Sequence, residues 1–196
     1  MNSKKVDREY LVDLANEMST SSVVSYEDLP KYDLFLSQVI DYLNDAFEDD
    51  NYTNNIVQNY IKSNVISKPE DGKKRGYTKD HLAQLVLLSH MRPVLTTEEI
   101  KNVFKLAFND INNREDDIIS WAEAYKIFSE IQEESFNDFL TTPLYDNDRL
   151  NQKMESLKLE EKEAERIKVF ILVMSLVAQA SSIKKMVQRL VKEYYE

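Results

Sequence analysis

The chain contains no cysteine and only two glycines and four prolines among its 196 residues. The absence of cysteine excludes a disulfide framework, a thiolate metal site and a cysteine nucleophile, and it favours a reducing cytoplasm as the location. Sheet-rich folds need turn residues at short intervals, so the scarcity of glycine and proline favours long helices. Hydrophobic residues make up 42% of the chain, enough for a folded core. Together these features predict a mainly α-helical protein.

The sequence also lacks the features of a membrane span and of the common active sites. Its longest apolar run, Val169–Ala180, is interrupted by Ser175 and Gln179 and is too short to cross a bilayer, so we expect a buried helix and no membrane association. The histidines His81 and His90 do not have the spacing of a zinc motif. No glycine-rich phosphate loop and no evident pair of catalytic carboxylates is present. We therefore expect neither enzyme activity nor a metal or cofactor.

Negative charge dominates the chain but is unevenly distributed. The net charge is −10, which by itself disfavours a nucleic-acid partner. Between Asn51 and Arg92, however, seven basic residues outnumber three acidic ones, a local charge of +4 that leaves −14 on the rest. Local potential decides what a surface attracts. The region is a candidate anion-binding surface, and the alternative is a chance patch on a solvated face.

Apolar residues recur at helical spacing along most of the chain. They predict helices over residues 4–19, 32–47, 79–91, 96–109 and 117–140, with further helical sequence to the end. Thr53 is placed to cap a short additional helix, along which Ile56, Val57, Tyr60 and Ile61 form a buried side. Thr96–Glu99 has the form of a capping box.

The short helix after Thr53 carries polar side chains on its outer face and leads into a basic loop. Both glycines, Gly72 and Gly76, bracket the basic residues of this loop, and Asp71-Gly72 is typical of a β-hairpin. Asn and Gln side chains can pair with adenine edges in the major groove, and a basic hairpin can neutralise phosphates. The alternative is an ordinary polar helix surface. The predicted DNA contacts are Thr53, Asn54, Asn55, Gln58, Asn59, Lys62, Lys68, Lys73, Lys74, Arg75, Tyr77 and Lys79.

This stretch resembles the MerR family of winged-helix regulators. Ile56–Pro69 is similar to the family's recognition helix and its exit into the wing, and the following matches are Arg75, Tyr77, Asp80, Leu82, Leu85, Met91, Arg92 and Thr96–Ile100. The chain departs from the family at Gln58, Asn59 and Asn64, where arginine, tyrosine and glycine are usual. The resemblance covers about residues 51–105 and implies a winged helix-turn-helix with a small β-hairpin wing, followed by a helical C-terminal bundle.

A second resemblance covers most of the chain, to about Gln132. Leu29–Leu43, Thr53–Pro69 and Lys74–Leu85 are similar to an uncharacterised bacterial family, domain of unknown function 1836. This resemblance implies a small regulator from Gram-positive bacteria, and it supplies no ligand and no catalytic residue.

The C-terminal region has the pattern of a partner surface. Its apolar residues repeat in steps of four and three over more than three heptads, which indicates a helix–helix seam. The predicted dimerisation residues are Val173, Leu176, Ile183, Val187, Leu190 and Tyr194. MerR-like proteins dimerise through a long helix after the winged domain, so the resemblance implies a homodimer. The alternative is that the seam packs inside its own bundle.

The expected organisation is an N-terminal helix over 1–22, a DNA-binding domain over 23–110 and a helical dimerisation or effector region over 111–196. The leading hypothesis is a cytoplasmic transcriptional regulator that binds double-stranded DNA as a homodimer. One alternative keeps the fold as a protein-interaction module without reading DNA. Another is a small-molecule sensor, in which Trp121, Tyr125 and Phe128 line an effector pocket; plain core is the competing explanation for these three side chains.

Overall fold

The computed structural model describes residues 13, 24–47, 51–69, 76–141, 152 and 160–195. For residues 133–141, 162 and 195 it describes the backbone alone. Backbone contacts divide the chain into two units. Unit 1 comprises Met1–Thr20 and Glu133–Met186, and unit 2 comprises Ser21–Gln132 and Val187–Glu196. The predicted helix over 4–19 lies outside the described residues apart from Asp13.

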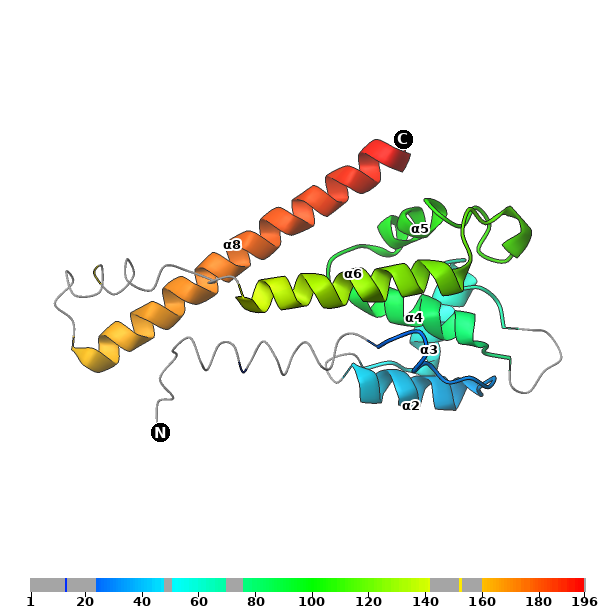
Figure 1. Ribbon diagram of the computed structural model, residues 1–196, viewed down its shortest axis with the longest axis horizontal. Helices are drawn as coiled ribbons and strands as arrows, with labels where there is room; N and C mark the ends of the chain where they lie inside the picture. Colours follow the sequence, from blue (N-terminus) through cyan, green and yellow to red (C-terminus); the bar gives the residue numbers. More distant parts are fainter. Residues whose placement is uncertain are drawn as a thin grey trace. The chain divides into compact units, whose positions relative to one another are not determined.

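Unit 2 is a helical assembly whose helices follow the predicted ones closely (Figure 1). The helices are α2 (Leu36–Ala46), α3 (Asn54–Lys62), α4 (Lys79–Met91), α5 (Thr97–Lys105) and the first half of α6 (Trp121–Thr141). A short 3-10 turn, η1 (Arg114–Asp116), precedes α6. The mainly helical character expected from composition is therefore confirmed for the described part of the chain.

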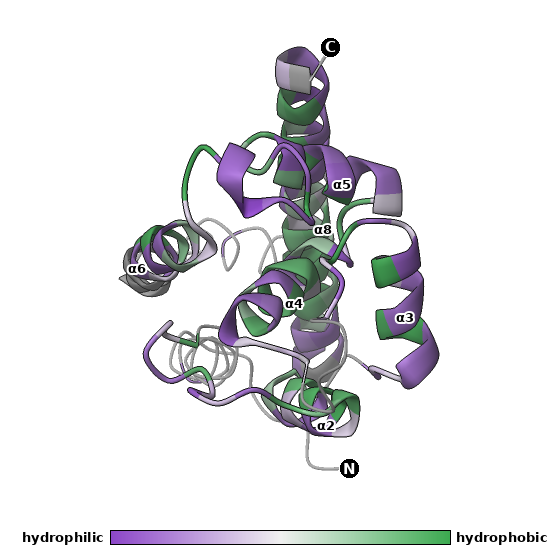
Figure 2. Ribbon diagram, turned by 90° about the vertical axis from the view of Figure 1, so that its right-hand side faces the viewer, coloured by the Kyte–Doolittle hydropathy of each residue, from purple (hydrophilic) through white to green (hydrophobic). Residues whose placement is uncertain are grey.

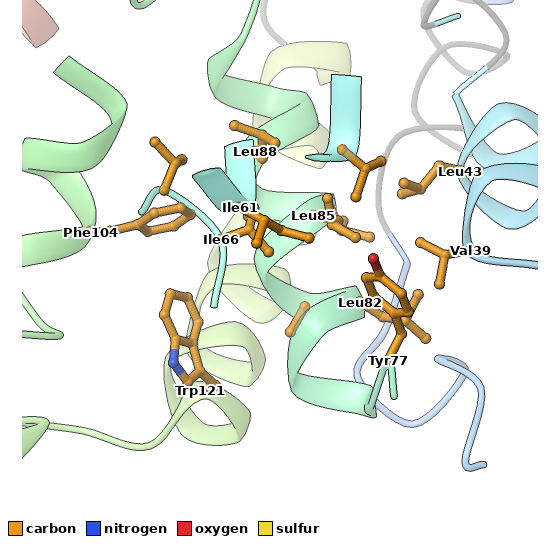
Figure 3. Close-up of a cluster of buried hydrophobic side chains, with 14 of the residues drawn as sticks. Val39, Leu43, Ile61, Ile66, Tyr77, Leu82, Leu85, Leu88, Phe104 and Trp121 are labelled. Atoms are coloured by element: carbon orange, nitrogen blue, oxygen red, sulfur yellow. The ribbon is translucent and has the colours of Figure 1, made fainter. Parts of the chain in front are cut away.

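Helix α4 is the centre of the hydrophobic core (Figure 3). Leu82, Leu85 and Leu88 on this helix are fully buried. Side chains from the surrounding helices converge on them, namely Val39, Leu43, Ile61, Phe104 and Trp121. Full burial of such a side chain is worth about 1.5–3 kcal/mol, so this cluster accounts for much of the stability of unit 2.

Two predicted helix caps are present in the structure. The Thr53 hydroxyl oxygen accepts a hydrogen bond from the backbone N–H of Ile56 at the start of α3. At the start of α5, the Glu99 carboxylate accepts the backbone N–H of Thr96 at 2.8 Å, while the Thr96 hydroxyl accepts that of Glu99 at 3.3 Å. Because caps and helical periodicity are local signals, the helix starts were readable from the sequence.

The predicted winged-helix fold with a β-hairpin wing is wrong for the described chain, in which no β-strand forms. The four successive backbone N–H groups of Val65–Lys68, just before the predicted hairpin, donate to acceptors outside that hairpin. Those of Val65 and Ile66 donate to the carbonyl of Tyr60, that of Ser67 to Gln84 and that of Lys68 to Asn112. Beyond the loop, Tyr77 pairs with Leu34 in an isolated antiparallel bridge. The segment is therefore packed on helices, and the tip, residues 70–75, lies outside the described residues.

The last helix, α8 (Glu161–Tyr195), departs from the all-round burial expected for Val169–Ala180. Leu172 is buried, but Phe170, Val173, Met174 and Val177 are about half exposed. Within the described residues, the stretch Glu163–Tyr194 is long and apolar enough to count as a candidate membrane span. Only 6% of the most apolar stretch of α8 is buried, so α8 presents apolar surface that the described chain leaves uncovered.

Candidate nucleic-acid interface

The outer face of α3 is a polar strip, defined here as Asn55, Asn59 and Lys62. The spacing of four and three residues places the three side chains above one another on the helix, and all three are exposed. Val57 and Ile61 lie on the opposite side and are buried. In Figure 2, hydrophobic and hydrophilic residues alternate along α3, as expected for a helix with one apolar side. Asn54 and Thr53 extend the exposed surface at the N-terminal end of α3.

The polar strip is held in place by contacts at the start of α3. The Asn44 side chain on α2 makes two hydrogen bonds to the backbone of Tyr52: its amide donates to the Tyr52 carbonyl at 3.1 Å, and its oxygen accepts the Tyr52 N–H at 2.7 Å. The buried Tyr52 hydroxyl lies 2.7 Å from that of Ser89 on α4. Because these contacts join Tyr52 to α2 and α4, they fix the position of the start of α3 and of the polar strip on it.

Three predicted DNA contacts are occupied within the protein. Tyr77 is buried, and its hydroxyl accepts a hydrogen bond from the Gln58 amide at 3.3 Å. Burial raises the pKa of the Tyr77 hydroxyl. The Lys79 ammonium lies over the Tyr26 ring, 4.1 Å from its centroid. Gln58, Tyr77 and Lys79 are therefore not part of the polar strip, which contains fewer residues than the predicted set of DNA contacts.

Lys68 is exposed, and its backbone is fixed on both sides. Its N–H donates to the Asn112 side chain at 2.9 Å, and its carbonyl lies 3.1 Å from the Nε2 atom of the buried His81. The Nδ1 atom of His81 accepts the backbone N–H of Thr78, so the neutral ring with its proton on Nε2 satisfies both contacts. The remaining predicted contacts, Lys73, Lys74 and Arg75, lie outside the described residues.

Acidic side chains lie close to this region as well. Asp80, at the start of α4, forms an ion pair with Arg114 of η1 at 2.7 Å. Asp117, which follows η1, has a raised pKa because of burial first and the neighbouring Asp116 second. The loop around η1 therefore contacts the chain on both sides of residues 70–75, at Lys68 and at Asp80. Its carboxylates add negative charge near these contacts.

Sequence reasoning missed the residues that hold the Val65–Lys68 segment. Gln84 is fully buried, and its side-chain oxygen accepts both the N–H of Ser67 at 2.9 Å and the Ser67 hydroxyl at 3.0 Å. The sequence feature that could have identified Gln84 is that it is a single amide within the apolar run of α4. Asn112 had no comparable signal, because its partner is 44 residues away in a polar loop.

The predicted dimerisation residues are not equivalent in the structure. Val173, Ile183, Leu190 and Tyr194 are each about half exposed or more, whereas Leu176 is half-buried. Val187 packs against the core of unit 2, and its neighbour Gln188 donates a hydrogen bond to Glu99 at 3.0 Å. The predicted seam is therefore partly used inside the chain.

The aromatic residues considered for an effector pocket belong to the core or its edge. The Trp121 ring stacks on Phe108 at 3.5 Å between centroids. Tyr125 is fully buried, and its hydroxyl donates to the carbonyl of Val24 at 2.8 Å. Phe128 packs against Tyr125 and His90. These contacts match the explanation of plain core. Over the described residues, no three acidic or histidine side chains are grouped as a metal site requires.

Comparison with known proteins identifies the family. Residues 24–128, more than half of the chain, match the family model described as Domain of unknown function (DUF1836). The chain belongs to this family. It is also 34% identical over 67 residues to the uncharacterized protein YkrK of Bacillus subtilis (strain 168). That match spans 33% of this chain and 28% of the relative, so the chain covers well under half of YkrK. No solved structure matches the chain significantly.

Proposed function

We propose that the protein is a transcriptional regulator that binds double-stranded DNA through α3 as a homodimer. The observation that carries the proposal is the polar strip: two exposed amides and a lysine aligned on one side of a helix whose other side is buried. Amide side chains can make paired hydrogen bonds to adenine edges in the major groove. Lys62 on the strip and the exposed Lys68 supply positive charge for contacts with phosphates.

The division of roles within the strip follows from its geometry. Asn55 lies in the first turn of α3 and Asn59 one turn further along, on a helix whose start is fixed by the Asn44–Tyr52 contacts, and base readout needs fixed donors and acceptors. Lys62 and Lys68 have long side chains with mobile charges, which suit phosphate contacts that carry no sequence information. Tyr77 and Lys79 are not part of the proposed interface, because both are engaged inside the protein.

The experiment selects genomic fragments with the full-length protein, sequences the enriched DNA and then titrates the preferred site by fluorescence anisotropy. Asn55→Ala and Asn59→Ala should each cost about 1–3 kcal/mol on the preferred site and little on unrelated DNA. The matched control is Gln179→Ala, an exposed amide on α8. An enriched motif that is insensitive to both α3 substitutions would place the contact elsewhere and reject α3 as the reading helix.

Salt dependence separates the lysines from the amides. If Lys62 neutralises one phosphate, Lys62→Ala should reduce the slope of log affinity against log salt by about 0.9, on every sequence alike. Lys62→Arg keeps the charge and should keep the slope. An unchanged slope in Lys62→Ala would show that this lysine does not bind the DNA backbone.

A protein-interaction module is the second candidate. It is favoured by Ile127 and Ile131, which are spaced four residues apart on α6 and are 50% and 57% exposed. A paired apolar surface of this kind suits a hydrophobic protein partner more than DNA. No enriched DNA motif, together with affinity loss for a protein partner in Ile127→Glu, would decide for this candidate.

A further inference from the structure

One side of α8 carries an exposed apolar stripe, defined here as Ile167, Phe170, Met174 and Val177. Their spacing of three and four residues places them along one side of the helix. Their side chains are 37%, 57%, 50% and 55% exposed. On the opposite side, Leu172 is buried and its neighbours along that face are half-buried. The apolar stripe thus lies on the uncovered side of α8 as far as Leu176, and from Val177 to Met186 the helix is exposed all round.

Charged residues of opposite sign continue the stripe at its two ends. Glu160 and Glu163 precede it on the same side of the helix, and Lys184 and Lys185 follow it. All four are exposed. The uncovered side of α8 therefore has an end with a net negative charge, where Glu160 and Glu163 outnumber Arg166, an apolar middle and a basic end.

We propose that the apolar stripe pairs with the same stripe of a second copy of the chain, with the two α8 helices antiparallel. In this register Ile167 lies opposite Val177 of the second copy, and Phe170 lies opposite its Met174. The acidic end of each helix then meets the basic end of the other, and the two helix dipoles oppose each other. A parallel pair would place Glu160 beside Glu160 and Lys184 beside Lys184, which is repulsive.

A second copy fits the stripe better than a lipid bilayer does. The segment without charged residues, Val169–Ile183, contains 15 residues. At a rise of 1.5 Å per residue it spans about 22 Å. The longer stretch Glu163–Tyr194 is long enough to cross a hydrocarbon core of roughly 30 Å, but a span would draw Lys168 or Lys184 into lipid. Two helices side by side need no such length, and their charged ends gain partners instead of entering lipid.

The pairing specifies the homodimer of the proposed function, but its test uses no DNA, so failure to pair and failure to bind DNA are separate results. Light scattering at micromolar concentration should give the mass of a dimer for the full chain. Phe170→Glu combined with Val177→Glu should give a monomer with an unchanged circular dichroism spectrum. The control, Ile183→Glu combined with Leu190→Glu, alters equally exposed apolar residues off the stripe and should remain a dimer. A monomeric full chain, or a dimer lost only in the control, overturns the proposal.

Orientation is tested by disulfide trapping, which the cysteine-free chain makes clean. Ile167→Cys and Val177→Cys should each form little disulfide dimer alone, because the two copies of one position lie about 15 Å apart along an antiparallel pair. Mixed together, the two variants should form a cross-linked heterodimer. Rapid cross-linking of Ile167→Cys with itself would show a parallel pair and reject the register. Retention of the full chain in sedimented lipid vesicles instead of dimerisation would assign the stripe to a membrane.

Discussion

Replacement of Gln84 by methionine tests why the segment before the basic loop packs on helices. Methionine nearly matches glutamine in size and shape but cannot accept the two hydrogen bonds from Ser67. The substitution leaves the backbone N–H of Ser67 buried without an acceptor, which costs about 1–3 kcal/mol, and removes the hydroxyl contact, worth roughly 1 kcal/mol. Removal of the buried Gln84 Nε2 group, which has no hydrogen-bond partner, returns about 1 kcal/mol. The net loss of stability is therefore about 1–3 kcal/mol.

Urea denaturation followed by tryptophan fluorescence measures this loss. Trp121 is the only tryptophan of the chain and is buried against Phe108, so its emission reports on unit 2. Ser67→Ala is the matched control: it removes only the hydroxyl contact and should cost about 0.5–1.5 kcal/mol. A Gln84→Met variant as stable as the unaltered protein would refute the account of the Val65–Lys68 segment.

Three further outcomes follow from single contacts. Asp117→Asn should raise the stability of unit 2 at pH 7 and change it little at pH 3, because burial raises the pKa of this carboxyl and its ionised form therefore destabilises the fold as pH rises; equal effects at both pH values in urea titrations would argue against this. Arg114→Ala breaks a half-exposed ion pair with Asp80 and should cost less than about 1 kcal/mol by thermal denaturation, whereas a larger loss would assign Arg114 a packing role. Tyr125→Phe removes the bond to the carbonyl of Val24 and should cost about 0.5–1.5 kcal/mol in the same assay; a neutral result would mean that water replaces the hydroxyl.

Local sequence signals specify the helices of unit 2 and the face that α3 presents. The caps at Thr53 and Thr96 and the apolar spacing of α3 and α4 act within a few residues, so the pattern of the chain contains the whole signal. The exposed residues Asn55, Asn59 and Lys62 follow from the same periodicity, because a helix that buries Val57 and Ile61 must expose its other side.

Asn64 illustrates how far the local signal reaches. Its φ of 54° is the left-handed conformation that ends many helices. Asparagine tolerates this conformation better than most residues other than glycine. Asn64 therefore suits the end of α3 without a glycine.

Long-range packing, in contrast, sets the path of the segment after α3 and the accessibility of the flanking residues. Asp71-Gly72 is a local hairpin signal, but Ser67 and Lys68 bind Gln84 and Asn112, which lie 17 and 44 residues away. Tyr77 is covered by packing that no local pattern contains. Along α8, heptad spacing shows that an apolar side exists, whereas which side stays uncovered depends on what packs against the helix. Long-range contacts engage hydrogen-bond donors, aromatic rings and apolar faces inside the protein. They therefore set which predicted site residues remain free to bind a partner.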